Sequence, residues 1–176
     1  IPGMMCDARL FGPQIAVFSG RRTLVCAPLT GRASVERFAA DVLTNAPNRF
    51  ALAGLSMGGI VAMEILRQAP ERVERIALID TNPLAEIDEI KARRLPQMVK
   101  VRDGVLDSVM RDEMKPQYLS DTPQRDSILD LCMEMALGLG PHVFMEQSRA
   151  LMDRPDQSDT LRSIDVPALV MCGRDD

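Results

Sequence analysis

The sequence predicts an α/β fold, in which a mostly parallel sheet is flanked by helices. Three observations support this prediction. Short apolar runs of strand length alternate along the chain with helical patterns, as in strand–helix–strand units. A glycine-rich turn joins one of these runs directly to a helical pattern. A long central stretch contains helical patterns but no strand signal, which indicates an inserted all-helical part.

Four apolar runs predict the strands of the sheet. Continuous apolar runs of this length are typical of strands that are buried on both faces. Pro167 stands near the start of the last run, where a strand tolerates proline. The predicted strands are residues 23–28, 50–55, 73–80 and 166–172.

Two helices are predicted between these strands. Apolar residues recur from Val35 to Leu43 at the spacing of one helix face, Ser34 is a suitable N-cap, and residues 45–48 end the pattern. The second helix runs over residues 57–69 and is stopped by Pro70.

Residues 82–164 form the inserted helical part. Pro96 is expected to break or kink its first helix. Seven of the twelve methionines lie here, and we expect most of them to pack the helices together rather than to line a pocket. The predicted helices are residues 85–100, 103–113, 124–137 and 142–153.

Composition restricts the class of protein. The 176 residues are enough for one domain, and 46% hydrophobic with 26% charged residues is typical of a globular protein. A net charge of −4 disfavours a nucleic-acid partner. No apolar run approaches the ~18 residues of a membrane span, so we expect no membrane partner. Cys6, Cys26, Cys132 and Cys172 lack metal or redox spacing, so we expect reduced, mostly buried cysteines, no bound metal and a cytoplasmic protein.

The sequence Gly54-Leu55-Ser56-Met57-Gly58-Gly59 joins the predicted strand 50–55 to the predicted helix 57–69. In this context, G-x-S-x-G predicts a nucleophile elbow, a sharp turn that strains the serine backbone and holds its hydroxyl outward. Side chains at Gly54 and Gly58 would collide with the neighbouring strand or helix, and Gly59 lets the helix pack closely. The N–H of Met57 lies at the helix start, where unpaired donors favour an oxyanion. The spacing fits neither of the common phosphate-binding glycine loops.

On these residues the chain resembles the α/β-hydrolase family, essentially from end to end. The resemblance implies a serine hydrolase that forms an acyl-enzyme on Ser56 from a small carboxylic ester, thioester or lactone, without a cofactor. Peptidases, carbon–carbon hydrolases and cofactor-free peroxidases share the same turn. Pro2-Gly3-Met4-Met5 resembles the loop that supplies the second oxyanion donor, with Met4 at the matching position and Met5 as the alternative. A tight turn on Gly3 accounts for that segment equally well.

The resemblance also implies a triad acid. Gly173-Arg174-Asp175-Asp176 resembles the loop after the seventh strand of the family, which makes Asp176 the acid and Asp175 the alternative. Asp80 is a further alternative, although a role in the turn at the end of its strand is preferred. The acid would orient the triad histidine and stabilise its charged form.

No histidine follows these acidic residues, although the family places its triad histidine there. His142 precedes them and is expected to be a surface or helix-capping residue. The chain is therefore expected to be the middle part of a longer protein, without most of the third strand and without the histidine segment. Its expected organisation is a first core part at 1–81, a helical lid at 82–164, and a core strand with the acid loop at 165–176.

A non-catalytic, ligand-binding relative of the same fold is the alternative function. The strained serine between glycines disfavours it, since a binder does not need that turn. A histidine in the downstream coding sequence, or labelling of Ser56 by a fluorophosphonate, would discriminate the two. Neither the identity of the substrate nor the oligomeric state follows from these residues.

Overall fold

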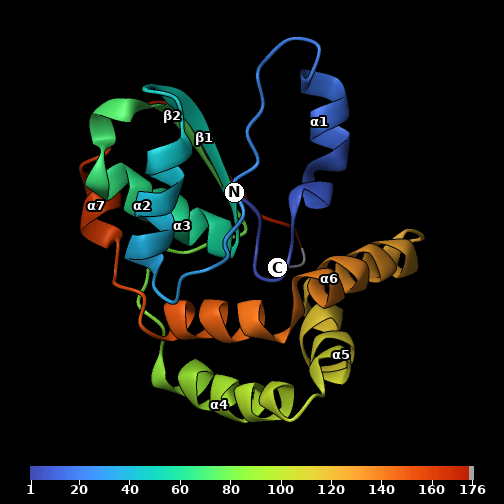
Figure 1. The fold of residues 1–176 in the computed structure, drawn as a ribbon. Coiled ribbons are helices and arrows are strands. Elements are labelled where there is room, and N and C mark those ends of the chain that lie inside the picture. Colours follow the sequence, from blue (N-terminus) through green and yellow to red (C-terminus); the bar gives the residue numbers. More distant parts are fainter. Residues whose placement is uncertain (175–176) are drawn as a thin grey trace.

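The computed structural model describes residues 1–174, which form a small parallel sheet, flanking helices and a separate group of helices (Figure 1). The elements run in the order η1 (Ala8–Phe11), α1 (Gly12–Phe18), α2 (Val35–Asn45), β1 (Phe50–Leu55), α3 (Met57–Gln68), η2 (Pro70–Arg72), β2 (Val73–Ile79), α4 (Asp88–Arg102), α5 (Leu106–Ser108), η3 (Val109–Met114), η4 (Lys115–Tyr118), α6 (Arg125–Met152), α7 (Ser158–Arg162) and β3 (Ala168–Met171).

The sheet is parallel, as predicted, in the order β1-β2-β3. Leu52 lies opposite Ile76, and Leu78 opposite Val170. Ile1 continues the ladder on the free edge of β1. Its amino group donates to the carbonyl oxygen of Ala53 (2.7 Å), and its carbonyl oxygen accepts from the N–H of Leu55 (3.2 Å). This is the hydrogen-bonding pattern of a neighbouring parallel strand. The segment after Ile1 therefore lies at the carboxyl end of the sheet.

The strand predicted at residues 23–28 is wrong. This segment is irregular, and Thr23 to Cys26 are exposed. An apolar run becomes a strand only where a neighbour completes its hydrogen bonds, and the described edge of β1 is taken at its carboxyl end by Ile1. The prediction that the strands are buried on both faces is also wrong, because Ala51, Ala53 and all of β3 are exposed.

One face of the sheet carries the main core. Helix α3 is buried from Met57 to Leu66 and lies against β1 and β2, while α2 covers its outer side (Figure 1). Ser34 caps α2 as predicted, since its hydroxyl accepts from the N–H of Arg37 (3.3 Å). Ala150 and Leu151 of α6 belong to the same core. The core therefore fixes α3, and with it the turn at Ser56.

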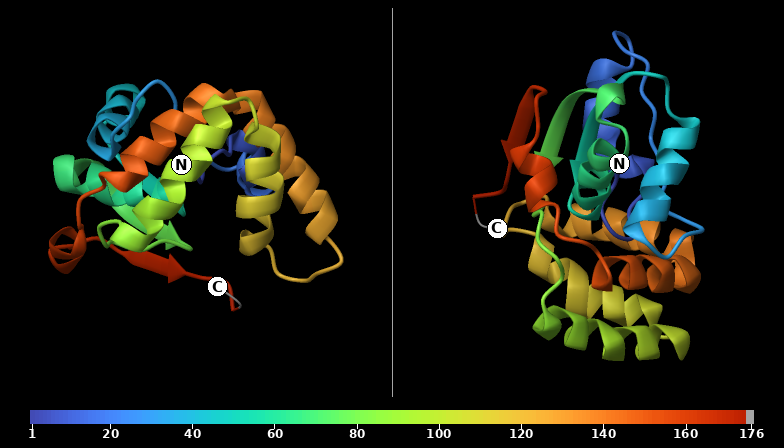
Figure 2. Two further views of the ribbon diagram at one scale, coloured as in Figure 1. Left: turned by 90° about the horizontal axis from the view of Figure 1, so that it is seen from below. Right: turned by 90° about the vertical axis from the view of Figure 1, so that its left-hand side faces the viewer.

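Residues 82–164 contain helices and no strand, as predicted. Pro96 does not break its helix, because α4 continues through it from Asp88 to Arg102. The predicted helix at 103–113 is divided between α5 and the π-helical η3. Helices α1 and α7 were not predicted, since neither shows a sustained apolar stripe. Helix α4 and the later half of α6 lie side by side beneath the carboxyl end of the sheet (Figures 1 and 2).

Helix α6 joins the two helices predicted at 124–137 and 142–153. Gly140 has a non-helical conformation (φ 80°, ψ 176°) and kinks the helix just before Pro141. We call residues 125–139 the outer arm and 141–152 the inner arm. By length and composition α6 is the one helix within residues 1–174 apolar enough to cross a membrane. Its inner arm packs Phe144 and Leu151 into the protein.

The helical part has a core of its own, which is rich in methionine. The methionines of this part that are buried pack the helices together, as expected: Met98, Met110, Met114, Met133 and Met135. Met5, from the loop after Ile1, belongs to the same core. The cysteines are free, but Cys26 and Cys172 are exposed, so the prediction of mostly buried cysteines holds only for Cys6 and Cys132.

Candidate active site

Ser56 forms the predicted sharp turn between β1 and α3. Its backbone has φ 51° and ψ −117°, in a region that costs a non-glycine residue about 1–3 kcal/mol. The surrounding structure holds this conformation: the N–H of Ser56 donates to the carbonyl oxygen of Ile79 (2.8 Å), and the hydroxyl of Thr81 donates to the carbonyl oxygen of Ser56 (2.9 Å). Ser56 is exposed, and its side chain does not cap α3. The hydroxyl is therefore presented outward.

The glycines around Ser56 are required by space. A Cβ at Gly54 would lie 2.2 Å from the carbonyl oxygen of Gly58, and a Cβ at Gly58 would lie 2.2 Å from that of Ile1. At Gly59 a Cβ would lie 2.5 Å from the Cγ2 of Thr81. Side chains at the first two positions would meet backbone, which cannot move aside without displacing the turn.

The loop after Ile1 lies beside Ser56. A Cβ at Gly3 would be 3.5 Å from the Cβ of Ser56. Of the two oxyanion candidates in this loop, Met5 donates its N–H to the Oε1 of Gln147 (2.8 Å). Within residues 1–174, the N–H groups of Met4 and Met57 make no hydrogen bond. The N–H of Met5 is thus engaged, whereas the N–H of Met4 is not.

Two side chains of the helical part hold this loop, and neither was predicted. Gln147 is 1% exposed and also donates from Nε2 to the carbonyl oxygen of Leu29 (2.8 Å). The Nζ of Lys115 lies 3.4 Å from the carbonyl oxygen of Met4. Gln147 could have been suspected, because it interrupts the apolar stripe of the inner arm.

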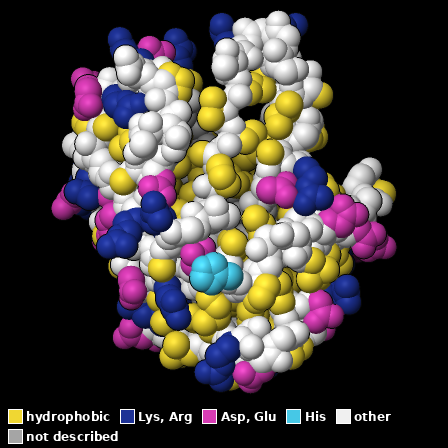
Figure 3. Space-filling view, in the orientation of Figure 1, with side chains coloured by type: hydrophobic (Ala, Val, Ile, Leu, Met, Phe, Trp, Pro, Cys, Tyr) yellow, Lys and Arg dark blue, Asp and Glu magenta, His cyan; other side chains and the backbone are white. Residues whose placement is uncertain are grey.

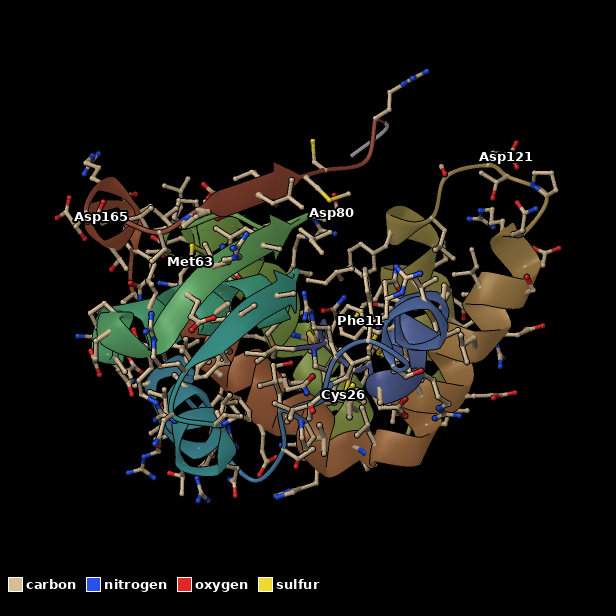
Figure 4. The ribbon with its side chains drawn as sticks, turned by 90° about the horizontal axis from the view of Figure 1, so that it is seen from above. Phe11, Cys26, Met63, Asp80, Asp121 and Asp165 are labelled. Atoms are coloured by element: carbon tan, nitrogen blue, oxygen red, sulfur yellow. The ribbon has the colours of Figure 1, made fainter. Side chains whose placement is uncertain are left out.

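The predicted acid loop is only partly described. Asp175 and Asp176 lie outside the described residues. Asp80, the other acid candidate, has φ 42° and accepts the N–H of Gly173 at Oδ1 (2.7 Å). Figure 4 shows Asp80 at the end of the strands, near the point where the chain leaves β3. Asp80 is thus engaged in the turn, and it anchors the start of the segment that leads to Asp175 and Asp176.

His142 is placed at the surface, where it was expected. Its side chain is 86% exposed, and its Nε2 lies 3.1 Å from the Oε1 of Glu146. Figure 3 shows it on the outside of the helical part. The other oxygen of Glu146 accepts the N–H of Gly31 (2.8 Å), so this pair ties α6 to the loop before α2. Within residues 1–174 no hydrogen bond joins His142 to Ser56.

A buried ion cluster lies next to the loop that carries Met4. Glu86 binds Arg94 (2.7 Å) and Arg154 (3.1 Å), and the Nη1 of Arg94 lies 3.8 Å from the sulfur of Met4. Burial lowers the pKa of Arg154, Glu86 opposes that shift, and Arg94 adds to it. The cluster fastens α4 and the end of α6 together. Among residues 1–174, no group of three or more His, Cys, Asp or Glu side chains is arranged to hold a metal ion.

A family model described as "Alpha/beta hydrolase family" matches residues 7–176. No curated protein matches the sequence. Among solved structures, a thermophilic esterase from Thermogutta terrifontis, with malate bound, superposes with a TM-score of 0.86 at 23% identity, over 98% of this chain and 69% of that chain. The enol-lactonase from Burkholderia xenovorans LB400 has a TM-score of 0.80 at 22% identity, over 98% of this chain and 70% of that chain. A hydrolase from Pseudomonas aeruginosa has a TM-score of 0.78 at 19% identity, over 98% of this chain and 69% of that chain.

Proposed function

Because the chain belongs to the alpha/beta hydrolase family, we propose that it carries the nucleophile of a serine hydrolase acting on a small carboxylic ester, thioester or lactone. One observation carries the proposal: Ser56 is held at φ 51° between glycines that have no room for a Cβ, with its side chain exposed and uncapped. A turn that only packed, or that only bound a ligand, would not need a serine in this strained conformation.

The oxygen of Ser56 attacks the carbonyl carbon, and its proton passes to a general base. The N–H groups of Met57 and Met4 stabilise the negative charge that develops on the carbonyl oxygen. The bond to the leaving group then breaks, the base returns the proton to the leaving group, and an acyl-enzyme remains on Ser56. Water, activated by the same base, hydrolyses the acyl-enzyme and releases the acid.

The base in this mechanism is a histidine that we expect outside residues 1–176, since His142 is bound to Glu146 at the surface. Asp176 would orient that histidine, with Asp175 as the alternative, and Asp80 would position their loop through Gly173. The helical part at 82–164 would act as the lid that shapes the substrate pocket. Two of the similar structures, an esterase and an enol-lactonase, support the substrate class.

The test uses the protein translated from the complete coding sequence that contains residues 1–176. We expect it to hydrolyse p-nitrophenyl butyrate, and to take up a fluorophosphonate on the tryptic peptide that contains Ser56. Ser56→Ala should abolish both, whereas Ser127→Ala, at an exposed serine of the outer arm, should preserve both. If the complete protein neither hydrolyses the ester nor takes up the label on Ser56, the chain is a non-catalytic ligand-binding relative and the proposal fails.

A further inference from the structure

Two cysteines meet in a buried cluster behind the loop that carries Met4. Cys6 follows Met5 in that loop, and Cys132 lies on the outer arm of α6. They are 8% and 7% exposed and pack together with Met135, and Leu10 and Leu131 cover the cluster. The two thiols lie far apart in the sequence, and the fold brings them together.

A buried lysine accompanies the two thiols. Lys115 is 4% exposed, and its Nζ lies 3.5 Å from the sulfur of Cys6 and 3.4 Å from the carbonyl oxygen of Met4. No carboxylate within residues 1–174 forms an ion pair with it. A buried ammonium group without a counter-charge is strongly unfavourable, and the thiols are the ionisable groups within its reach. Lys115 therefore favours a single negative charge on the cysteine pair.

The acidity of the two thiols is consistent with this arrangement. The hydrogen bond from Cys6 lowers the pKa of Cys132 to about 6, with Lys115 acting in the same direction against burial. The same hydrogen bond, together with burial, raises the pKa of Cys6. The other nearby charges are already paired at the surface, since Arg9 binds both Asp7 (2.7 Å) and Glu134 (3.5 Å).

We propose that Cys6 and Cys132 form a redox-active dithiol that a small hydroperoxide oxidises to a disulfide. The thiolate of Cys132 attacks the peroxide oxygen, the O–O bond breaks, and Cys132 becomes a sulfenic acid, while the expelled hydroxide or alkoxide takes a proton from solvent and leaves as water or an alcohol. The sulfur of Cys6 then attacks the sulfenic sulfur, the S–O bond breaks, and a second water leaves with the proton of the Cys6 thiol. In total, two thiols are oxidised by two electrons, and one peroxide is reduced.

This site is independent of the hydrolase chemistry, because neither Ser56 nor a triad base takes part in it. It is also specific to one pair. The other two cysteines are exposed, with Cys26 in the irregular segment before α2 and Cys172 after β3. They can be replaced without disturbing the buried cluster, which leaves a clean background for the test.

The test begins with the double variant Cys26→Ser/Cys172→Ser. Two thiols should titrate with Ellman's reagent after denaturation of the reduced protein, and none after exposure of the native protein to hydrogen peroxide. Mass spectrometry should find the loss of two hydrogen atoms and a dithiothreitol-sensitive link between the peptides that contain Cys6 and Cys132. The proposal is overturned if both thiols survive, or if Cys132 advances to a sulfinic acid without a link to Cys6.

Lys115 provides the second measurement. In the same background, measured at pH 5, Lys115→Met should slow peroxide oxidation about tenfold, because losing a nearby positive charge raises the thiol pKa by about a unit and pH 5 lies below both the old and the new pKa of Cys132. Lys115→Arg keeps the charge and should restore most of the rate. An unchanged rate in a folded Lys115→Met variant, checked by circular dichroism, contradicts the role of the lysine. The cross-linking result stands whether or not this variant folds.

Discussion

Replacing Gln147 with leucine is expected to destabilise the protein clearly, because this side chain makes two buried hydrogen bonds. Its Oε1 accepts from the N–H of Met5 and its Nε2 donates to the carbonyl oxygen of Leu29, both at 2.8 Å. Met5 and Leu29 are 0% and 2% exposed, so water does not replace the lost partner. Each unpaired group costs about 1–3 kcal/mol. Leucine recovers about 1–2 kcal/mol through apolar burial, which leaves a net loss of about 3 kcal/mol.

Urea unfolding followed by circular dichroism measures this loss. With a slope of about 2 kcal/mol per molar urea, the midpoint of Gln147→Leu should fall by about 1.5 M. Gln14→Leu is the matched control, since Gln14 is exposed on α1. Substitutions at the surface usually change the free energy of unfolding by no more than about 0.5 kcal/mol. If the two variants have the same midpoint, the two bonds of Gln147 contribute nothing and the argument from buried polar groups is refuted.

Gln147→Glu sharpens the same test. The glutamate can still accept from the N–H of Met5, but its ionised form cannot donate to the carbonyl oxygen of Leu29. Burial beside that oxygen raises the pKa of the new carboxyl group in the folded state. The folded variant then binds more protons than the unfolded one, so its stability relative to wild type should rise as the pH falls from 7 to 5. A flat difference over this range would contradict the geometry.

Three further predictions concern stability. Gly58→Ala should unfold the chain or destabilise it by more than about 3 kcal/mol in urea, whereas Gly138→Ala, whose Cβ would meet only the guanidinium of Arg9 at an ordinary contact distance of 3.9 Å, should be neutral or slightly stabilising; equal effects would contradict the crowding at the turn. Ser34→Ala should cost about 1 kcal/mol through loss of the cap on α2, and Ser34→Asp should retain the stability. Burial acts to raise the pKa of Glu64, but hydrogen bonds from Arg67, Gln68 and Gln157 outweigh it and hold that pKa below its usual value. Glu64→Gln should therefore cost stability at pH 7, and the difference from wild type should shrink as the pH falls below about 4.5 through the native pKa; a difference that stays constant with pH would contradict it.

The local pattern of the sequence predicts the frame of the site well. The strand at 50–55, the helix that follows it and the parallel pairing with β2 are confirmed. The strain at Ser56 follows from the G-x-S-x-G motif between a predicted strand and a predicted helix, and the positive φ of Ser56 confirms it. These features depend on residues close together in the chain.

The errors and omissions arise from contacts between distant residues. The apolar run at 23–28 has the composition of a strand, but whether it becomes one depends on a neighbour that its own pattern does not specify. The hydrogen bond from Met5 to Gln147 joins residues 142 positions apart. The same applies to Lys115 and Cys6, which are 109 positions apart. The acid, the histidine and the cytoplasmic location stay predictions.

The kink at Gly140 lets the two arms of α6 pack in different parts of the protein. The inner arm is anchored in the core and carries Gln147, which grips the loop of Met4 and Met5. The outer arm carries Cys132 and ends at Gly140, whose φ of 80° changes the direction of the helix. The kink directs the outer arm to the cluster of Cys6 and Cys132, away from the loop that Gln147 holds. The single helix thus serves two places at once: its inner arm holds the loop beside Ser56, and its outer arm completes the buried cluster of the two thiols.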